Sequence, residues 1–215
     1  DLITGAVTFR GKVHGTGDQE KSTIHFGGAA SDITVTKPVE EKNDIYAQKS
    51  GSLSTDHTTA TYTVTIGSNK GTGDTVAIND AIDYGSSTGA KPTYQRDSFK
   101  IVKVDASGAQ TPVSGHSPTW GDNGGKGVSF SVTGLPALGP NEKYVATYAM
   151  DMHVDANATT VNVNNKAVGT SGDHSRDAWG NVYWKQEQEV QKSGTFDQAT
   201  GKISWRVTVN PNGRD

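Results

Sequence analysis

The chain has no cysteine among its 215 residues, so neither a disulfide nor a thiolate site is possible. It has no apolar run that approaches the ~20 residues of a membrane-spanning helix, which excludes membrane insertion of that kind. The formal net charge is only −3, which gives no electrostatic basis for binding nucleic acid or an anionic membrane surface. Neither a signal peptide nor a sorting tail is present, which indicates a fragment of a mature protein.

Aromatic residues are also scarce, at 7 % of the chain, whereas 26 glycines and many Thr, Ser, Val and Asn residues favour strands and turns. No stretch has a sustained helical period. Short strand-like runs recur with Gly- and Asn-rich joints between them, and this spacing predicts an all-β fold, an Ig-like β-sandwich. The predicted strands cover residues 6–12, 22–26, 32–36, 60–66, 75–82, 98–104, 128–132, 143–150, 160–168 and 202–209.

An internal repeat indicates more than one module. Gln-Lys-Ser-Gly occurs at residues 48–51 and again at 191–194, each time followed by a turn and an alternating strand. We therefore predict the closing strands of a preceding Ig-like subdomain (1–36), one complete Ig-like domain (37–184) and the opening strands of a following similar module (185–215). Because strands at incomplete ends carry an apolar face, we expect them to pair with a neighbouring module or a second chain.

Three polar residues, Lys49, Asp80 and Asn165, lie on strands that are otherwise predicted to be core. Side chains alternate along a strand, so each of them shares a face with apolar residues two positions away. These neighbours are Ala47 for Lys49, Ile78 and Ile82 for Asp80, and Val163 and Ala167 for Asn165. Burying a Lys, an Asp or an Asn alone is costly. Together they predict either a buried ion pair beside a hydrogen-bonded Asn or a covalent Lys–Asn isopeptide crosslink.

The order of these motifs resembles a known family. Lys49 in Lys-Ser-Gly, the strand over 62–66, Asp80 and Asn165 follow one another as in the second Ig-like subdomain of Gram-positive, cell-wall-anchored collagen-type adhesins. Residues 3–9, 21–26 and 32–37 resemble the closing strands of the family's first subdomain. The Asn-x-Ala pattern at 165–167 is similar to that of pilin isopeptide domains. The resemblance covers most of the chain.

The resemblance implies an extracellular domain, cell-wall-anchored in its parent protein, that attaches to a host extracellular-matrix protein or glycan, with a collagen-like ligand as one candidate. It also implies that Lys49 bonds to Asn165 and that Asp80 is the acid that promotes the bond. The repeat around Lys192 has no acid strand or acceptor Asn after it, so we expect Lys192 to stay a free amine.

The implied reaction is attack of the Lys49 amine on the Asn165 carboxamide carbon, with loss of ammonia. Burial favours the neutral, nucleophilic form of a lysine. An apolar site also favours a protonated Asp80, which can hydrogen-bond the carboxamide oxygen and transfer protons. The reaction needs no cofactor and turns over once, so the protein is not expected to be an enzyme in the usual sense.

Other residues are alternatives for the acceptor, for the acid and for a binding site. Asn164 is a competing acceptor, and Asp83 and Asp74 are competing acids. The six histidines and the Asp173, His174, Asp177 group match no metal-ligand spacing, so no metal is predicted. Trp120, Trp179 and Tyr183 lie in segments predicted as Gly-rich loops and are possible ligand contacts, or else loop anchors packed on the sandwich edge, whereas Trp205 is predicted as core. The alternative functions are a pilin or stalk module without its own ligand and a carbohydrate-binding module of a secreted enzyme.

Overall fold

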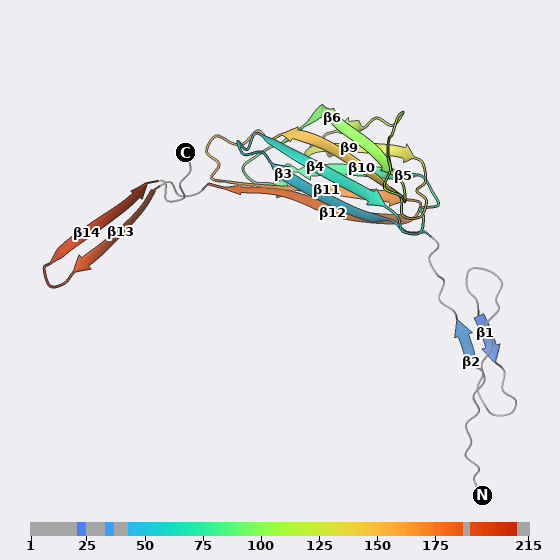
Figure 1. Ribbon diagram of the computed structural model, residues 1–215, viewed down its shortest axis with the longest axis horizontal. Coiled ribbons are helices and arrows are strands. Elements are labelled where there is room, and N and C mark those ends of the chain that lie inside the picture. Colours follow the sequence, from blue (N-terminus) through green and yellow to red (C-terminus); the bar gives the residue numbers. More distant parts are fainter. Residues whose placement is uncertain (1–20, 25–32, 37–42, 187–189, 210–215) are drawn as a thin grey trace, which may run out of the picture. The chain divides into compact units, whose positions relative to one another are not determined.

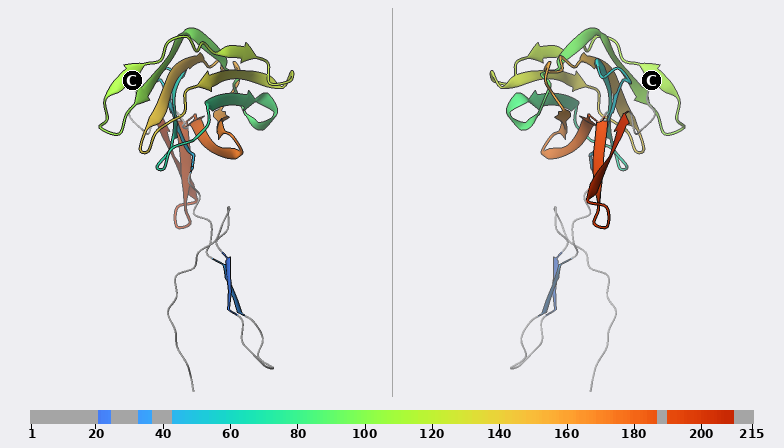
Figure 2. Two further views of the ribbon diagram at one scale, coloured as in Figure 1. Left: turned by 90° about the vertical axis from the view of Figure 1, so that its right-hand side faces the viewer. Right: turned by 90° about the vertical axis from the view of Figure 1, so that its left-hand side faces the viewer.

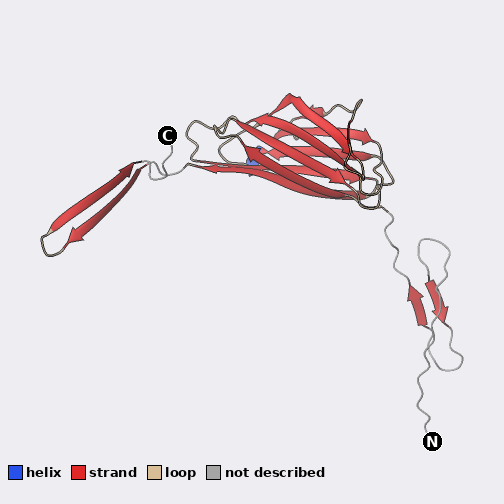
Figure 3. Ribbon diagram, viewed as in Figure 1, coloured by secondary structure: helices blue, strands red, loops and turns tan. Residues whose placement is uncertain are grey.

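The computed structural model describes residues 21–24, 33–36, 43–186 and 190–209. The chain divides into two compact units, residues 1–42 and 43–215. Among the described residues every regular element is a strand except one 3₁₀ turn, η1 (Tyr84–Ser86), so the predicted all-β fold is confirmed (Figure 3). The predicted division at residues 36 and 184 stays a prediction.

Ten strands form two five-stranded antiparallel sheets, the two layers of a β-sandwich, which is seen from three sides in Figure 1 and Figure 2. The order is β3-β4-β10-β6-β7 in one sheet and β12-β11-β5-β9-β8 in the other. The chain crosses between the sheets repeatedly, as Ig-like sandwiches do. The strands are β3 (Tyr46–Leu53), β4 (Thr59–Gly67), β5 (Val76–Asp83), β6 (Thr93–Val104), β7 (Gln110–Pro112), β8 (Thr119–Gly121), β9 (Gly127–Leu135), β10 (Lys143–Asp151), β11 (Thr160–Ser171) and β12 (His174–Lys185).

Alternate side chains of both sheets fill the space between them. Every second residue of β11 is buried, from Val161 to Ser171. Tyr62, Tyr148 and Phe130 are among the largest fully buried side chains, and the rings of Tyr148 and Phe130 meet edge to face at 5.2 Å between centroids. A tyrosine ring adds apolar area, but its hydroxyl needs a partner when it is buried. This core therefore brings polar groups into the interior.

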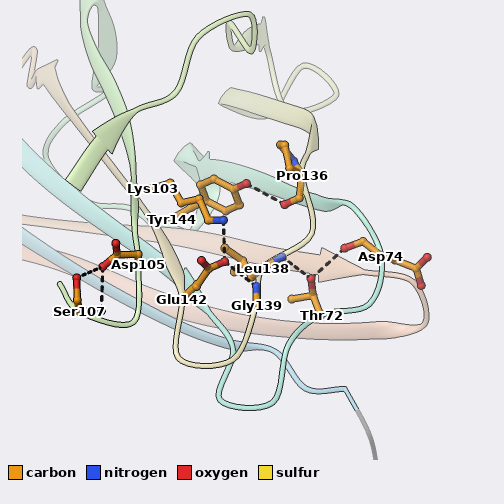
Figure 4. A network of polar contacts seen from close by, with 10 residues as sticks. All are labelled: Thr72, Asp74, Lys103, Asp105, Ser107, Pro136, Leu138, Gly139, Glu142 and Tyr144. Carbon is orange, nitrogen blue, oxygen red and sulfur yellow. Dashed lines mark hydrogen bonds and ion pairs between the residues drawn. The ribbon is translucent and has the colours of Figure 1, made fainter. Parts of the chain in front are cut away.

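Hydrogen bonds tie the loop between β4 and β5 to the loop between β9 and β10 (Figure 4). The backbone N–H of Leu138 donates to Thr72 Oγ1 at 2.9 Å, and the Thr72 hydroxyl donates to the carbonyl of Asp74 at 3.0 Å. Glu142 forms an ion pair with Lys103 of β6, with Nζ and Oε2 2.7 Å apart. The network joins the two sheets through their connecting loops.

Strand β12 is the longest segment that the sequence patterns missed. Gly-rich loops were predicted around Trp179 and Tyr183, and this was wrong: all twelve residues of β12 pair with β11. Its many polar residues and Gly180 give β12 no strand-like pattern in the sequence. The strand forms because β11 supplies a backbone hydrogen-bonding partner along its whole length. Trp120 also lies on a strand, β8, rather than in a loop. The strand predicted over residues 6–12 lies outside the described residues.

Two hairpins complete the described structure: β1 (Lys21–Ile24) pairs with β2 (Ile33–Thr36), and β13 (Val190–Asp197) pairs with β14 (Lys202–Val209). The second hairpin repeats the register of β3 and β4. The matching pairs are Lys49–Val64 and Gly51–Tyr62 in one, and Lys192–Val207 and Gly194–Trp205 in the other. Trp205 was predicted as core, yet it is 62 % exposed, because no second sheet covers this hairpin within the described residues.

Candidate functional site

Lys49, Asp80 and Asn165 come together in the interior of the sandwich. Asp80 of β5 and Asn165 of β11 are diagonal neighbours, since Asp80 is opposite Ala167 and Asn165 is opposite Ile82 in the antiparallel ladder. Lys49 reaches them from β3 in the other sheet. The side chains of Lys49 and Asp80 are both 0 % exposed, and Asn165 is fully buried as well. The strand parity seen in the sequence is thus matched by three inward-facing side chains.

Lys49 forms an ion pair with Asp80, between Nζ and Oδ2. Its aliphatic chain passes Gly180 of β12, the residue paired with Asn165, where a Cβ would come within 2.8 Å of Lys49 Cγ. Burial lowers the pKa of Lys49 to about 8, although the negative charge of Asp80 acts in the opposite direction. A lysine in this position reaches its nucleophilic amine form far more readily than one in water.

Two tyrosines donate hydrogen bonds to Asp80. Tyr94 Oη donates to Oδ1 and Tyr148 Oη donates to Oδ2, each at 2.8 Å. Burial, followed by the nearby Asp80 charge, raises the pKa of both phenols well above its usual value. Both hydroxyls therefore keep their protons and act as donors. With Lys49 on Oδ2 as well, both carboxylate oxygens have partners.

The Asn165 carboxamide is bound through its nitrogen. Nδ2 donates to Tyr148 Oη at 3.1 Å, whereas Oδ1 is buried and makes no hydrogen bond within the described structure. Tyr62 Oη is a second buried polar atom without a partner there. The predicted hydrogen bond from Asp80 to the carboxamide oxygen is not formed, because the Tyr148 hydroxyl lies between the carboxylate and the amide nitrogen.

The tyrosines are the residues that the sequence reasoning missed. Tyr62 shares the strand parity of Ala60 and Val64, and Tyr148 shares that of Ala146 and Met150, so in the sequence neither differs from an ordinary core residue. A buried tyrosine on the same sheet face as a buried acid is the signal that could have identified them.

The competing residues lie elsewhere. Asn164 points away from the core and donates to the Ser86 carbonyl at 2.6 Å. Asp83 caps η1 by accepting from the Gly85 N–H at 2.8 Å. Asp74 lies in the loop network of Figure 4. None of the three contacts Lys49 through any described hydrogen bond or ion pair.

The aromatic candidates separate into two kinds. Trp120 packs in a ring cluster with Phe130 at 5.5 Å and Tyr94 at 5.0 Å, so it is an anchor packed on the sandwich, although on strand β8 and not in a loop. Trp179 and Tyr183 are 53 % and 62 % exposed on the outward face of β12, and Lys166 lies over the Trp179 ring at 5.4 Å. Only the second kind offers a ring surface to a partner.

Two of the described histidines make local contacts. His57 packs against Trp184 with ring centroids 4.5 Å apart and the rings tilted by 39°, and His153 hydrogen-bonds Thr93 Oγ1 at 2.8 Å. Within the part of the chain that the structure covers, no three His, Asp or Glu side chains are placed to hold a metal ion. No helix among those same residues is long and apolar enough to cross a membrane.

No family model matches this sequence, and no curated protein matches it. Among solved structures, the chain is similar to the collagen-binding domain of a Staphylococcus aureus adhesin (14 % identity, TM-score 0.40, covering 63 % of this chain and 97 % of that one). It is also similar to the collagen-binding subdomain of the Enterococcus faecalis surface protein ACE (11 %, 0.38, 68 % and 100 %) and to the major pilin SpaD of Corynebacterium diphtheriae (16 %, 0.42, 74 % and 39 %).

Proposed function

We propose that residues 43–186 are a self-crosslinked β-sandwich module of a bacterial surface adhesin or pilus. The crosslink is an isopeptide bond between Lys49 and Asn165, promoted by Asp80. The observation that carries this proposal is the fully buried Lys49–Asp80 pair, joined to the Asn165 carboxamide through one tyrosine hydroxyl. Desolvation makes a buried ion pair costly, and formation of the bond removes both charges from the core.

The fold supplies most of what the reaction requires. It holds amine, carboxyl and carboxamide on three strands of a rigid core, and such positioning is worth ~7–11 kcal/mol of barrier. Burial keeps part of the Lys49 population neutral, and Asp80 accepts the proton that the amine gives up. The reaction occurs once per chain and uses no cofactor. The protein is then a scaffold and not a turnover enzyme.

A crosslink from β3 to β11 links the first strand of one sheet to a central strand of the other. Pulling on the module then loads a covalent bond in place of the hydrogen bonds between strands. This suits a domain that carries force outside the cell, in an adhesin or a pilus stalk. A cell-wall anchor belongs to the parent protein in this proposal.

The second part of the proposal concerns the ligand that the adhesin binds. The motif order resembles collagen-type adhesins, so a collagen-like matrix protein is the first candidate. Trp179 and Tyr183 on the outward face of β12 supply the contact surface, and a host glycan that stacks on these rings is the alternative. A stalk module without its own ligand would show neither kind of binding.

Two measurements test the crosslink and the ligand-binding surface separately. Tandem mass spectrometry of a tryptic digest should find the peptides of Lys49 and Asn165 joined, and their separate recovery in full would refute the crosslink. Binding to immobilised collagen and to a glycan array should fall at least tenfold in Trp179→Ala and Tyr183→Ala, with Asn181→Ala on the same face as the control. Equal binding by all four proteins would exclude this surface.

A further inference from the structure

The hydroxyl of Tyr148 occupies the space between the acid and the acceptor. It donates to Asp80 Oδ2 at 2.8 Å and accepts from Asn165 Nδ2 at 3.1 Å, and the residue is 1 % exposed. No direct hydrogen bond joins Asp80 to Asn165 in the described structure. Any proton that moves between the carboxyl group and the amide nitrogen therefore has one route of hydrogen bonds, and that route runs through Tyr148.

The hydrogen bonds of Tyr148 also determine the orientation of the Asn165 carboxamide. A phenol has one proton and donates it to the strongest nearby acceptor, here the carboxylate. Its lone pair is then left to accept, which requires the NH₂ end of Asn165 to face it. The nitrogen that must leave as ammonia is thereby the atom held against Tyr148, and the carbonyl oxygen points away from it.

We propose that the Tyr148 hydroxyl is a catalytic proton relay, which passes a proton from Asp80 to the leaving nitrogen of Asn165. This rests on the proposed Lys49–Asn165 crosslink. Lys49 first gives a proton to Asp80, and the free amine attacks Asn165 Cγ. Tyr148 gives its proton to Nδ2 as it takes the proton on Asp80 Oδ2, and the bond from Cγ to Nδ2 breaks.

The hydrogens balance around this step. The ammonium of Lys49 and the amide of Asn165 bring five in all. One stays on the new amide nitrogen and three leave on ammonia. The fifth passes from the attacking Lys49 nitrogen to Asp80 after Asp80 has given its first proton to the relay, so Asp80 ends neutral. The ion pair is lost as a whole, so the core keeps no isolated charge after the reaction.

Tyr94 provides a matched control, because it makes only half of the same contacts. It donates to the other oxygen of Asp80 at the same distance of 2.8 Å and is bound to Asp80 alone, without a hydrogen bond to Asn165 in the described structure. A role in holding or tuning Asp80 predicts similar effects from both tyrosines. A proton relay predicts that only the loss of the Tyr148 hydroxyl greatly slows crosslinking.

The experiment compares wild type, Tyr148→Phe and Tyr94→Phe. Each full chain is made in a short burst of cell-free synthesis, and intact mass is followed as ammonia is lost, with near-ultraviolet circular dichroism as a check on folding. We expect Tyr148→Phe to slow crosslinking by ~10²–10⁴-fold, the usual range for a lost acid–base group, and Tyr94→Phe by less than tenfold. The slowing should persist at every pH between 6 and 9.

Each outcome decides one question. Tyr148→Phe reacting within threefold of wild type, or both variants slowed equally, overturns the relay and leaves the crosslink standing. A wild-type chain that never loses ammonia overturns the crosslink itself. If Tyr148→Phe does not fold, 3-fluorotyrosine placed at position 148 keeps the ring and hydroxyl but makes the phenol more acidic. The relay then predicts a changed rate, and an unchanged rate overturns it.

Discussion

Lys49 of β3 and Asp80 of β5 meet across the two sheets as an ion pair with both side chains fully removed from solvent. Such a pair contributes little to stability by itself, because desolvation of two charges offsets most of their attraction. Its role is chemical, because it holds a nucleophile, the Lys49 amine, and a proton acceptor, Asp80, next to the buried carboxamide of Asn165.

The rate of crosslinking should depend on pH through Lys49. Burial lowers the pKa of Lys49 to about 8, so the amine is the minority form at neutral pH and becomes the majority form above that value. Because the reactive state carries the Lys49 proton on Asp80, we expect the rate in the cell-free assay to stay constant below about pH 8 and to fall by up to about tenfold per pH unit above it, where the pair loses that proton to solvent. A rate that rises steadily from pH 6 to 9 would contradict the transfer of the Lys49 proton to Asp80.

Gly180 should be required for Lys49 to reach Asn165. An added Cβ would lie 2.8 Å from Lys49 Cγ and 3.1 Å from the Ser50 backbone, so Gly180→Ala should displace the lysine and slow or abolish crosslinking. Gly169→Ala is the control, since its Cβ would instead meet Ile66 Cδ1 at 2.6 Å, away from the lysine. It should lower stability but leave the crosslink intact. Equal crosslinking in both variants would argue against this path for Lys49.

The crosslink should supply much of the stability of the sandwich. A bond from Lys49 to Asn165 closes a loop of about a hundred residues, which the chain-entropy estimate values at ~4–5 kcal/mol. Lys49→Met/Asp80→Asn removes both charges and the bond together, so it avoids the penalty of an unpaired buried charge. We expect this double variant to lose about that much free energy of unfolding in guanidinium titrations and to become sensitive to trypsin. A loss below ~1 kcal/mol would mean that the bond is absent or without energetic effect.

The sequence was sufficient for the fold class and for the inward placement of Lys49, Asp80 and Asn165, because strand parity alone puts these three side chains on the core face. It was not sufficient for β12, whose strand character comes from pairing with β11 and not from its own residues. It also missed Tyr94 and Tyr148, because parity shows only that a residue is inward-facing and gives no information on which partner in the opposite sheet it meets.

Lys192 tests how far the internal repeat extends. Its hairpin copies the register of β3 and β4, and its Nζ lies over the Trp205 ring at 4.3 Å. Among the described residues it has no acid and no acceptor Asn beside it. We expect peptide mapping to recover Lys192 as a free amine and hydrogen exchange to show protection across β14. A crosslinked Lys192 would show that the predicted module boundary is wrong, and rapid exchange throughout Lys202–Val209 would rule out a paired hairpin.

The intact mass of the purified chain tests the central proposal most directly. Formation of the Lys49–Asn165 bond removes one ammonia, so the native protein should weigh one ammonia less than its sequence requires. Lys49→Ala and Asp80→Ala should each restore the full mass, because one lacks the nucleophile and the other lacks the group that takes its proton. A wild-type chain with the unmodified mass would contradict the account.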